Sequence, residues 1–519
     1  MNMIARPPAS YDELRSTFRW QLPPSYNLGV DIADRHPRNS VAIIATDGRR
    51  ATRLITFGEL SDSSNQLANA LRALGLGPGD RIAVLLPQRF ETAVAHIAAY
   101  KLRAIAIPLS IMFGPEAIES RLRDAGPAVV IGETEALAKI DGLDLSPRVI
   151  DVDRDWNDLL SAASTRFTPA ATTPDTPALI IYTSGTTGPP KGALHAHRIL
   201  FGHLPGVEMS HDFFPKPGDL FWTPADWAWI GGLFDVLMPA LHHGLPIVAF
   251  RAQRFDPEQA LDLIEHLNVR NVFMPPTALR LMREADCSRS DLRSVASGGE
   301  TLNEDLIEWG RASLGLTINE FYGQTEANML VSNCSSLWKP KPGSMGKPAP
   351  GHDVSIIDGE IVVRAEGDPV VFLGYWNNQA ATADKIRDGW LRTGDLGTID
   401  DDGSIRFIGR ADDVITSGGY RIGPGEIEAC LVRHPAVSLV AVVGSPDPVR
   451  GQVVKAFVVP AEGREGTPQL AKELQSFVKE RLAAYEYPRV IEFIDELPMT
   501  TTGKIQRGVL RQRGETADA

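Results

Sequence analysis

The sequence has few cysteines, no long apolar run and no excess of basic charge. Its three cysteines, Cys287, Cys334 and Cys430, form no CxxC or CxxH pair, which argues against a disulfide framework and a structural zinc site. Asp and Glu number 65 against 52 Lys and Arg, a net charge of −13, so no nucleic-acid partner held by a broad cationic face is expected. No stretch approaches the roughly 18 apolar residues of a membrane span, and none near the N-terminus resembles a signal peptide. These absences predict a cytoplasmic protein without a membrane span.

The 519 residues, 43% hydrophobic and 23% charged, are typical of a globular protein with several folded units. Short apolar strands alternate with helical patterns over 55–132, and the alternation resumes over 178–274. This alternation predicts sheets covered by helices on both faces. Strand-and-turn patterns follow, and helices and strands return after Arg410. We expect an α/β fold, with an N-terminal domain of parallel and mixed sheets over 1–410, a β-rich subdomain within it at about 343–410, and a small α+β C-terminal domain over 411–519.

The most informative segment is YTSGTTGPPKG at 182–192, directly after the apolar strand 178–181. Glycines let backbone N–H groups surround an anion, hydroxyls add donors and Lys191 adds a cation, so we expect a phosphate cradle between this strand and a following helix. Gly192 stands where a Walker motif requires Ser or Thr, which disfavours a P-loop kinase or ATPase. The candidate phosphate-binding residues are Thr183, Ser184, Gly185, Thr186, Thr187, Gly188 and Lys191.

Further motifs follow this segment in a fixed order. They are GGET at 298–301, YGQTE at 322–326, WLRTGD at 390–395, GRADDVI at 409–415, SGGYRIGP at 417–424 and LPMTTTGKI at 497–505. In this order they resemble the adenylate-forming superfamily, and most closely its medium-chain acyl-CoA synthetase branch. The resemblance covers nearly the whole chain. It implies that a carboxylate attacks the α-phosphate of ATP to give acyl-AMP and pyrophosphate, after which coenzyme A takes the acyl group as a thioester.

The resemblance gives each motif a place around ATP. Lys504 would bridge the attacking carboxylate and the α-phosphate, where a fixed cation stabilises the charge that rearranges. Glu326, a hard oxygen ligand, would bind Mg²⁺, and Thr325 would donate to the α-phosphate. Asp395 would accept hydrogen bonds from the ribose hydroxyls, with Arg410 beside the nucleotide. The other positions expected around ATP or AMP are Gly299, Glu300, Thr301, Glu320, Phe321, Tyr322, Gly323 and Gln324.

The resemblance also implies a mobile C-terminal domain, which would rotate about a hinge at Asp412 and carry Lys504 away from the site for thioester formation. Acetylation of Lys504, a control found in the family, would remove its positive charge. Glycines at the expected coenzyme A site allow close backbone approach, and basic residues near it would form a local groove for phosphates. The residues expected to contact coenzyme A are Gly418, Gly419, Tyr420, Arg421, Arg450, Lys479, Tyr487 and Arg489.

The acyl pocket is expected to be formed by Trp227, Ile230, Gly231 and Gly323. Acetate-specific members of the family carry Trp where this chain has Gly323, so the resemblance implies room for a short- to medium-chain, branched or aromatic acid. Each additional buried CH₂ contributes about 0.8 kcal/mol, so the preference should be graded. A homo-oligomer is compatible with the sequence.

Three alternatives share the same nucleotide motifs. An amino-acid- or aryl-acid-adenylating enzyme is one, although Asp235 lies a few residues beyond the carboxylate position that amino-acid-adenylating domains use, a position that falls near apolar Ile230. A luciferase-type oxygenase is the second. The third is a non-catalytic nucleotide-binding protein, whose usual mark would be loss of Lys504, Glu326 or Lys191, all of which are present.

Overall fold

The computed structural model of the chain describes all residues except 1, 5, 6, 49, 145, 146, 184–189, 253, 288–290, 412, 418, 419, 448, 449, 483–485, 501–503, 518 and 519. These described residues form two compact units. The first unit takes its described residues from Met1–Ser184, Pro190–Val354 and Val363–Leu391, and the second takes its own from Ser355–Val362 and Arg392–Ala519. The second unit thus begins before the expected boundary at 410, which stays a prediction.

One sheet of the first unit is seven-stranded within the described residues. Its strands from β7 to β6 are parallel, which confirms the alternation of strand and helix in the sequence. In spatial order the strands are β18 (Gly374–Tyr375), β8 (Lys191–Ala196), β7 (Pro177–Thr183), β4 (Ile105–Pro108), β3 (Arg81–Leu85), β5 (Val129–Gly132) and β6 (Arg148–Asp151).

The prediction of a helix directly after the phosphate segment is wrong. The chain leaves β7 and returns as strand β8, antiparallel to β7, with Thr183 opposite Lys191 and Tyr182 opposite Gly192. The residues from Lys191 onward pair as a strand because β7 offers them a free neighbouring edge, and β18 then covers β8 on its other side. The residues from Lys191 therefore form a strand, and they do not direct the N-terminus of a helix at a phosphate bound by this segment.

A second sheet of this unit is nine-stranded among the residues described. Its central strands are parallel, and its two ends are closed by antiparallel neighbours. The order is β15 (Lys347–Pro348), β14 (Asn328–Ser332), β13 (Asn319–Gln324), β12 (Ser294–Gly298), β11 (Asn271–Phe273), β9 (Phe221–Trp222), β10 (Ile247–Ala249), β1 (Val41–Thr46) and β2 (Ala51–Thr56).

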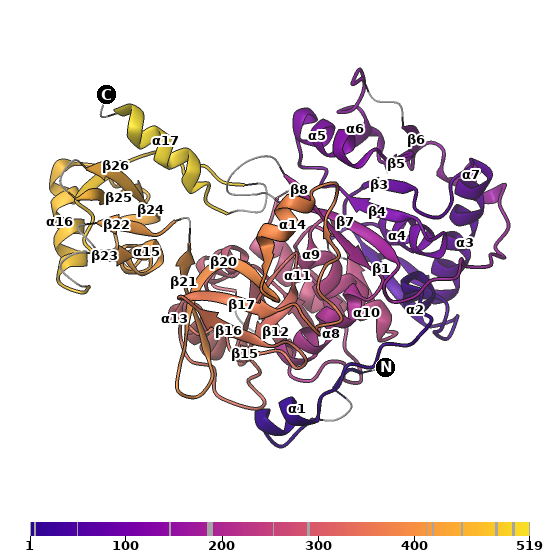
Figure 1. Cartoon of the computed structure of the whole chain (residues 1–519), viewed down its shortest axis with the longest axis horizontal. Coiled ribbons are helices and arrows are strands. Elements are labelled where there is room, and N and C mark those ends of the chain that lie inside the picture. Colours follow the sequence, from indigo (N-terminus) through magenta and orange to yellow (C-terminus); the bar gives the residue numbers. More distant parts are fainter. Residues whose placement is uncertain are drawn as a thin grey trace. The chain divides into compact units, whose positions relative to one another are not determined.

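Helices cover both sheets of this unit (Figure 1). The long helix α3 begins at a capping box, in which Thr56 Oγ1 accepts from the Glu59 amide at 3.2 Å and the Glu59 carboxylate accepts from the Thr56 amide at 2.8 Å. The helical segments, including two π-helical turns, are α1 (Tyr11–Thr17), α2 (Leu28–Ala33), α3 (Phe57–Ala73), α4 (Phe90–Lys101), α5 (Pro115–Ala125), α6 (Thr134–Leu137), α7 (Trp156–Ser161), α8 (Ile199–Ser210), α9 (Ile230–Gly232), η1 (Leu233–Leu237), α10 (Met238–His242), α11 (Pro257–Leu267), α12 (Pro276–Glu284), α13 (Glu304–Trp309), η2 (Gly310–Leu314) and α14 (Gln379–Lys385).

Alternating side chains of β3 explain why its sheet is covered on both faces. Ile82 and Val84 belong to the largest hydrophobic cluster, which also contains the apolar residues of α4. Ala83 and Leu85 belong to a separate cluster with residues of α5 and α6. Successive strand residues point to opposite faces, so each face of the sheet has its own core.

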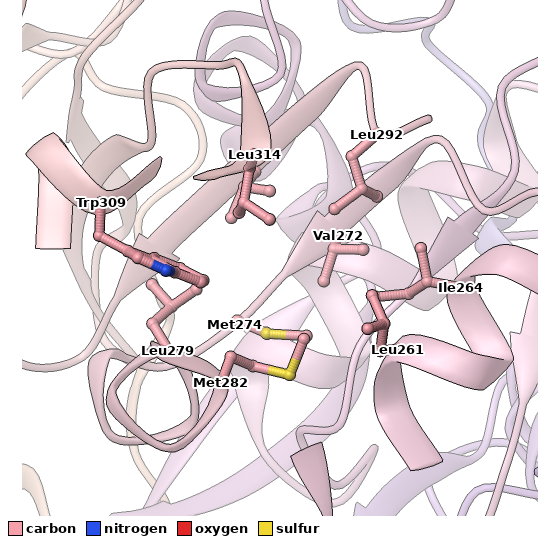
Figure 2. A pocket seen from close by; sticks show the side chains of 10 residues that line it. Leu261, Ile264, Val272, Met274, Leu279, Met282, Leu292, Trp309 and Leu314 are labelled. Atoms are coloured by element: carbon pink, nitrogen blue, oxygen red, sulfur yellow. The ribbon is translucent and has the colours of Figure 1, made fainter. Parts of the chain in front are cut away.

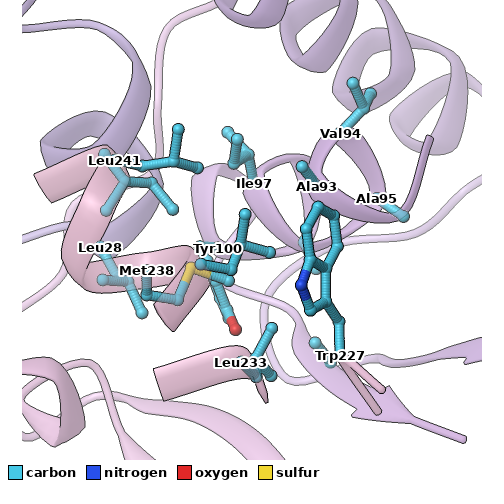
Figure 3. Close-up of a cluster of buried hydrophobic side chains, with 14 of the residues drawn as sticks. Leu28, Ala93, Val94, Ala95, Ile97, Tyr100, Trp227, Leu233, Met238 and Leu241 are labelled. Carbon is cyan, nitrogen blue, oxygen red and sulfur yellow. The ribbon is translucent and has the colours of Figure 1, made fainter. Parts of the chain in front are cut away.

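The largest cluster also contains Trp227, which is fully buried, and Figure 3 shows its indole among the side chains of this cluster. Another cluster lies between the nine-stranded sheet and helices α11, α12 and α13. It encloses a cavity of about 10 Å³, lined by apolar residues including Met274, Met282 and Trp309 (Figure 2). This volume holds one water at most, so the cavity is a packing defect and no substrate site.

A third sheet confirms the strand-and-turn pattern after Gly343. Its strands are β16 (Val354–Ile357), β17 (Glu360–Arg364), β20 (Trp390–Ile399), β19 (Ile386–Arg387) and β21 (Ile405–Arg410), with β21 paired to β20.

The C-terminal part of the second unit has its own sheet and core. Helices α15 and α16 contribute Ile427, Leu431 and Leu474 to a cluster with Val442 and Val454 of the sheet. Its elements are β22 (Ile415–Ser417), β23 (Tyr420–Ile422), α15 (Pro424–Val432), β24 (Val437–Asp447), β25 (Gly451–Pro460), α16 (Pro468–Lys479), β26 (Val490–Phe493) and α17 (Arg507–Ala517). This α+β arrangement is the one that the sequence predicts.

Candidate functional site

The β7–β8 hairpin places two of the predicted phosphate-binding residues opposite each other. Thr183 ends β7, Lys191 begins β8, and the Thr183 hydroxyl donates to the Lys191 carbonyl at 3.4 Å. The Lys191 side chain is partly exposed. Ser184, Gly185, Thr186, Thr187 and Gly188 lie outside the described residues. Any phosphate bound at this end of the hairpin would therefore meet the Lys191 ammonium at the start of a strand.

Tyr375 contacts both Glu326 and Lys191. The Tyr375 hydroxyl donates to Glu326 Oε1 at 2.5 Å, and the Lys191 ammonium lies 5.4 Å from the centre of the Tyr375 ring. Glu326 is buried, with 7% of its surface exposed. No sequence motif points to Tyr375, because a lone Tyr has no characteristic spacing and the pairing of β18 with β8 brings it here.

Among the described residues, no three of His, Cys, Asp and Glu lie close enough together to bind a metal ion. A single buried carboxylate such as Glu326 suits an ion that takes its other ligands from nucleotide phosphates and water, as Mg²⁺ usually does. The residues present therefore fit Mg²⁺ that arrives with a nucleotide.

The loop after β12 carries the GGET motif. Gly299 has φ +89°, a conformation that favours glycine, and no atom lies within 4 Å of where its Cβ would be. The Glu300 carboxylate accepts from Arg280 at 2.8 Å and from the Thr277 hydroxyl at 3.0 Å. Thr301 is exposed. The loop thus presents an open surface at Gly299 beside a carboxylate that is already fixed.

Glu320 fixes the same loop from β13. Its Oε1 accepts from the Leu302 amide at 3.2 Å, while its Oε2 is buried and has no hydrogen-bond partner among the residues that the structure describes. Burial raises the pKa of Glu320 to about 8, and the Leu302 amide opposes this shift. Glu320 is therefore largely protonated at neutral pH, and it holds the loop by its hydrogen bond with the Leu302 amide.

The rest of the YGQTE strand turns from the core toward the surface. Phe321 is buried, and its ring lies 2.7 Å from where a Cβ on Gly298 would be. Tyr322 and Thr325 are partly exposed. The Gln324 amide oxygen accepts from the Lys385 ammonium at 3.0 Å. Of the residues that the sequence predicts here, Tyr322 and Thr325 have side chains with surface left for a ligand.

Gly323 is exposed, and the backbone alone already requires glycine there. A Cβ on Gly323 would lie 2.1 Å from the Asn328 carbonyl oxygen, at a point where the pairing of β13 with β14 shifts register. Any larger residue would force these strands apart. The glycine thus has a reason in the fold besides the space that it leaves for an acyl group.

The segment predicted to line the acyl pocket is divided between core and surface. Trp227 is fully buried, whereas Ile230 and Gly231 are partly exposed. A Cβ on Gly231 would lie 3.0 Å from the Phe273 ring. The structure therefore leaves Ile230 and Gly231 open to a ligand.

Asp235, which lies a few residues beyond the carboxylate position of amino-acid-adenylating domains, is paired inside the protein. Its Oδ1 lies 2.7 Å from His203 Nδ1, and both side chains are buried. Burial raises the pKa of Asp235, and His203 lowers it.

Asp395 and Arg410 lie opposite each other on β20 and β21 of the second unit. Asp395 is 5% exposed, and its Oδ1 accepts from the Arg410 guanidinium at 3.0 Å. The strand register thus orients this carboxylate before any nucleotide binds.

Lys504 lies in the C-terminal part of the second unit, and its side chain is exposed. Its backbone closes a short loop: the Lys504 amide donates to Thr500 Oγ1 at 3.0 Å, and the Thr500 amide donates to the Lys504 carbonyl at 2.7 Å. Met499 and Ile505 pair across the base of this loop. The loop fixes the backbone of Lys504 and leaves the ammonium to solvent.

Two basic residues predicted to contact coenzyme A, Lys479 and Arg489, lie near the ring of a third such residue, Tyr487. The Lys479 ammonium lies 5.7 Å and the Arg489 guanidinium 5.2 Å from the centre of the Tyr487 ring. Arg450 is exposed. The backbones of Tyr420 and Arg421 lie on β23, opposite Ser417 and Thr416. Gly418, Gly419 and the predicted hinge residue Asp412 are outside the described residues.

Two family models match the chain. Residues 31–376 match the AMP-binding enzymes, and residues 426–504 match the AMP-binding enzyme C-terminal domain. The chain belongs to the AMP-binding enzymes. Lys191 and Glu326 lie within the first matched range and Lys504 within the second, whereas Asp395 and Arg410 lie between the two.

Similar proteins agree on the reaction. Human mitochondrial acyl-coenzyme A synthetase ACSM4 is 36% identical, with 95% of this chain and 91% of that protein covered. The acetyl-coenzyme A synthetase of Bacillus subtilis is 34% identical, with 93% and 90% covered. This chain is an AMP-forming acyl-CoA synthetase, an acid–thiol ligase that binds ATP, as the sequence motifs predict.

Solved structures confirm the fold. A Brucella canis acyl-CoA synthetase has a TM-score of 0.75 at 36% identity, with 98% of this chain and 100% of that chain covered. ATP-bound MatB from Rhodopseudomonas palustris has a TM-score of 0.85 at 28% identity, with 95% and 99% covered. The anthranilate CoA ligase AuaEII with anthranoyl-AMP has a TM-score of 0.87 at 29% identity, with 96% and 99% covered. The α/β fold with a small C-terminal domain is thus shared with these enzymes. Among the described residues, no helix is both long and apolar enough to cross a membrane.

Proposed function

We propose that this acyl-CoA synthetase activates a short- to medium-chain, branched or aromatic carboxylic acid with Mg-ATP and transfers the acyl group to coenzyme A. The observation that carries the nucleotide step is the group of Lys191, Tyr375 and Glu326, which places a cation and a buried carboxylate on one aromatic ring. A cation that meets phosphate and a carboxylate that meets a metal are the two charges that Mg-ATP requires.

Mg²⁺, when bound, would neutralise phosphate charge during attack on the α-phosphate. Glu326 would be its protein ligand, Lys191 and Thr183 would contact phosphate, and Thr325 would donate to the α-phosphate. Asp395, already oriented by Arg410, would accept from the ribose hydroxyls. The adenine would lie against Tyr322 and the open backbone at Gly299.

Lys504 would supply the positive charge that brings the substrate carboxylate and the α-phosphate together. Its exposed ammonium supports this role, because an ammonium in solvent can meet a substrate without first leaving a buried position. The same exposure leaves it accessible to acetylation, which would remove the charge. For thioester formation, we propose that the domain turns about Asp412 and that Lys479, Arg489 and Arg450 meet the phosphates of coenzyme A.

The acyl segment supports the proposed range of acids. Ile230 and Gly231 are partly exposed and apolar, and Gly323, which is predicted to line the same pocket, is exposed and carries no side chain. The named relatives act on different acids, acetyl in one and anthranilate in another. The preference therefore has to be measured on this chain.

The test is pyrophosphate release with Mg-ATP and coenzyme A across acetate, propionate, isobutyrate, butyrate, hexanoate, octanoate, benzoate and several amino acids, with mass spectrometry of the thioester. Turnover that peaks between butyrate and octanoate, or on a branched or aromatic acid, is expected. A peak on acetate would contradict the open pocket. Turnover of an amino acid without a thioester would favour the adenylating alternative, which the pairing of Asp235 with His203 speaks against.

A further inference from the structure

The segment 372–376 is bound along its backbone to the strand that begins with Lys191. The Leu373 amide donates to the Leu194 carbonyl at 2.8 Å, and the Trp376 amide donates to the Gly192 carbonyl at 2.7 Å. Tyr375 pairs with Ala193, two residues from Lys191. The backbone of Tyr375 is therefore fixed relative to the phosphate hairpin.

The same segment is bound to Glu326 at two points. The Phe372 amide donates to the Glu326 carbonyl at 3.1 Å, and the Tyr375 hydroxyl donates to Glu326 Oε1 at 2.5 Å. Main chain and side chain of Glu326 are thus both held by residues of one short segment.

A phenol suits this position better than a charged donor would. A Lys or Arg hydrogen-bonded to Glu326 would neutralise the carboxylate, and a neutralised carboxylate attracts a divalent cation less. A hydroxyl orients one oxygen and leaves the negative charge in place. The face of the same ring also attracts the Lys191 ammonium, which lies 5.4 Å from its centre.

We propose that Tyr375 is a positioning residue for Mg-ATP: its hydroxyl fixes the Glu326 carboxylate for the metal, and its ring sets the distance between that carboxylate and Lys191. This inference rests on the proposed role of Glu326 as the Mg²⁺ ligand. It adds to the site a residue from outside the sequence motifs.

The decisive variant is Tyr375→Phe, which keeps the ring beneath Lys191 and removes only the hydroxyl. The experiment titrates a non-hydrolysable ATP analogue calorimetrically into each protein, with and without Mg²⁺. Wild type should bind the analogue more tightly with Mg²⁺ than without it. Tyr375→Phe should lose about tenfold of this Mg²⁺-dependent increase and keep the metal-free affinity. A loss of the same size in both conditions, or no loss, would overturn the proposal.

A double-mutant cycle tests whether Tyr375 acts through Glu326. Glu326→Gln alone should abolish the Mg²⁺-dependent increase, and adding Tyr375→Phe should weaken binding no further. Additive losses would mean that the two residues act separately. Tyr11→Phe is a matched control, because the Tyr11 hydroxyl also donates one hydrogen bond, at 2.9 Å to the Pro348 carbonyl, on a different part of the unit. It should leave the Mg²⁺-dependent increase unchanged.

These titrations contain neither acid nor coenzyme A, so their result is independent of which substrate the enzyme takes. If no carboxylic acid supports pyrophosphate release, the proposed function fails while the role of Tyr375 is still measured. If an acid is activated but Tyr375→Phe leaves the Mg²⁺-dependent increase in affinity unchanged, the positioning role alone fails. In the pyrophosphate assay, Tyr375→Phe should raise the Mg²⁺ concentration needed for half-maximal rate and leave KM for the acid unchanged.

Discussion

Glu326 and Lys504, the two charged residues expected to act on ATP, lie in contrasting surroundings. Glu326 is buried in the first unit, with its side chain and its main chain both hydrogen-bonded to one segment. Lys504 is exposed on the second unit, and its backbone amide donates to the Thr500 hydroxyl. The carboxylate is oriented in advance by the fold, whereas the lysine can take its position from the substrate. Loss of the charge at Glu326 should thus impair metal-dependent binding and the reaction, and changes at Lys504 should affect chemistry alone.

The largest expected effect after that of Lys504 is at the buried carboxylate. Glu326→Gln should lower pyrophosphate release by about 10²-fold or more, because it removes the charge expected to hold the metal at the phosphates. The free energy of unfolding should not fall, since a buried neutral amide costs less to desolvate than a carboxylate. Pyrophosphate assays and urea unfolding measure the two effects. Glu308→Gln, an exposed change on α13, is the control. Retention of more than a tenth of the activity would remove Glu326 from the metal site.

The next effect is expected at the ion pair of the second unit. Asp395→Asn keeps the shape of the side chain but removes its negative charge. The carboxylate that pairs with Arg410 and is proposed to accept hydrogen bonds from the ribose hydroxyls is thereby lost. KM for ATP should rise roughly tenfold, in line with about 1.5 kcal/mol for a hydrogen bond to a charged group, and KM for the acid should not change. Asp401→Asn, on an exposed turn, should match wild type. An unchanged KM for ATP in the Asp395 variant would exclude contact with the nucleotide.

Smaller effects are expected at the basic residues around Tyr487, because exposed charges act weakly one by one. Lys479→Gln and Arg489→Gln should each raise KM for coenzyme A by about threefold and leave acid-dependent ATP–pyrophosphate exchange unaffected. Steady-state thioester formation and exchange assays separate these results. The control is Lys472→Gln, also an exposed lysine of α16. Equal effects of Lys472 and Lys479 would mean that net charge, and no specific groove, attracts coenzyme A.

The prediction with the smallest effect on activity concerns the stability of the fold and its dependence on pH. Burial raises the pKa of Glu320 from an ordinary value near 4.5 to about 8, so the folded state holds a proton that the unfolded state releases between these pH values. The free energy of unfolding should therefore fall as pH rises from about 4.5 to about 8, by up to about 1.4 kcal/mol per pH unit. Urea unfolding at pH 6 and pH 8 should show a shallower decline in Glu320→Gln. An unchanged slope would mean that Glu320 is ionised in the folded protein.

Hydrophobic pattern and motif order predicted the strands and helices well. Within the predicted alternation over 55–132, strands β3, β4 and β5 alternate with helices α4 and α5, and over 178–274 strands β9, β10 and β11 are separated by helices α10 and α11. These elements are set by local apolar period and by Pro or Gly at their ends, which a single sequence displays.

Features that depend on pairing between distant residues could not be predicted. The segment from Lys191 became a strand because β7 lay beside it, although Gly and Pro before it suggested a loop leading to a helix. Tyr375 reaches Glu326 only because β18 pairs with β8, far away in sequence. Gly323 was linked to the acyl pocket, and its close approach to the Asn328 carbonyl became visible only in the hairpin of β13 and β14.

The contrast between the fixed carboxylate and the exposed lysine is tested most directly by measuring the two half-reactions separately in Lys504→Ala. Acid-dependent ATP–pyrophosphate exchange reports adenylation, and thioester formation from synthetic butyryl-AMP and coenzyme A reports the second step, in which no carboxylate has to approach a phosphate. The exchange should fall by about 10²-fold or more, thioester formation should stay within about threefold of the Lys472→Ala control, and the melting temperature should not change because an exposed side chain adds little stability. Equal losses in both half-reactions, or a lowered melting temperature, would contradict the account.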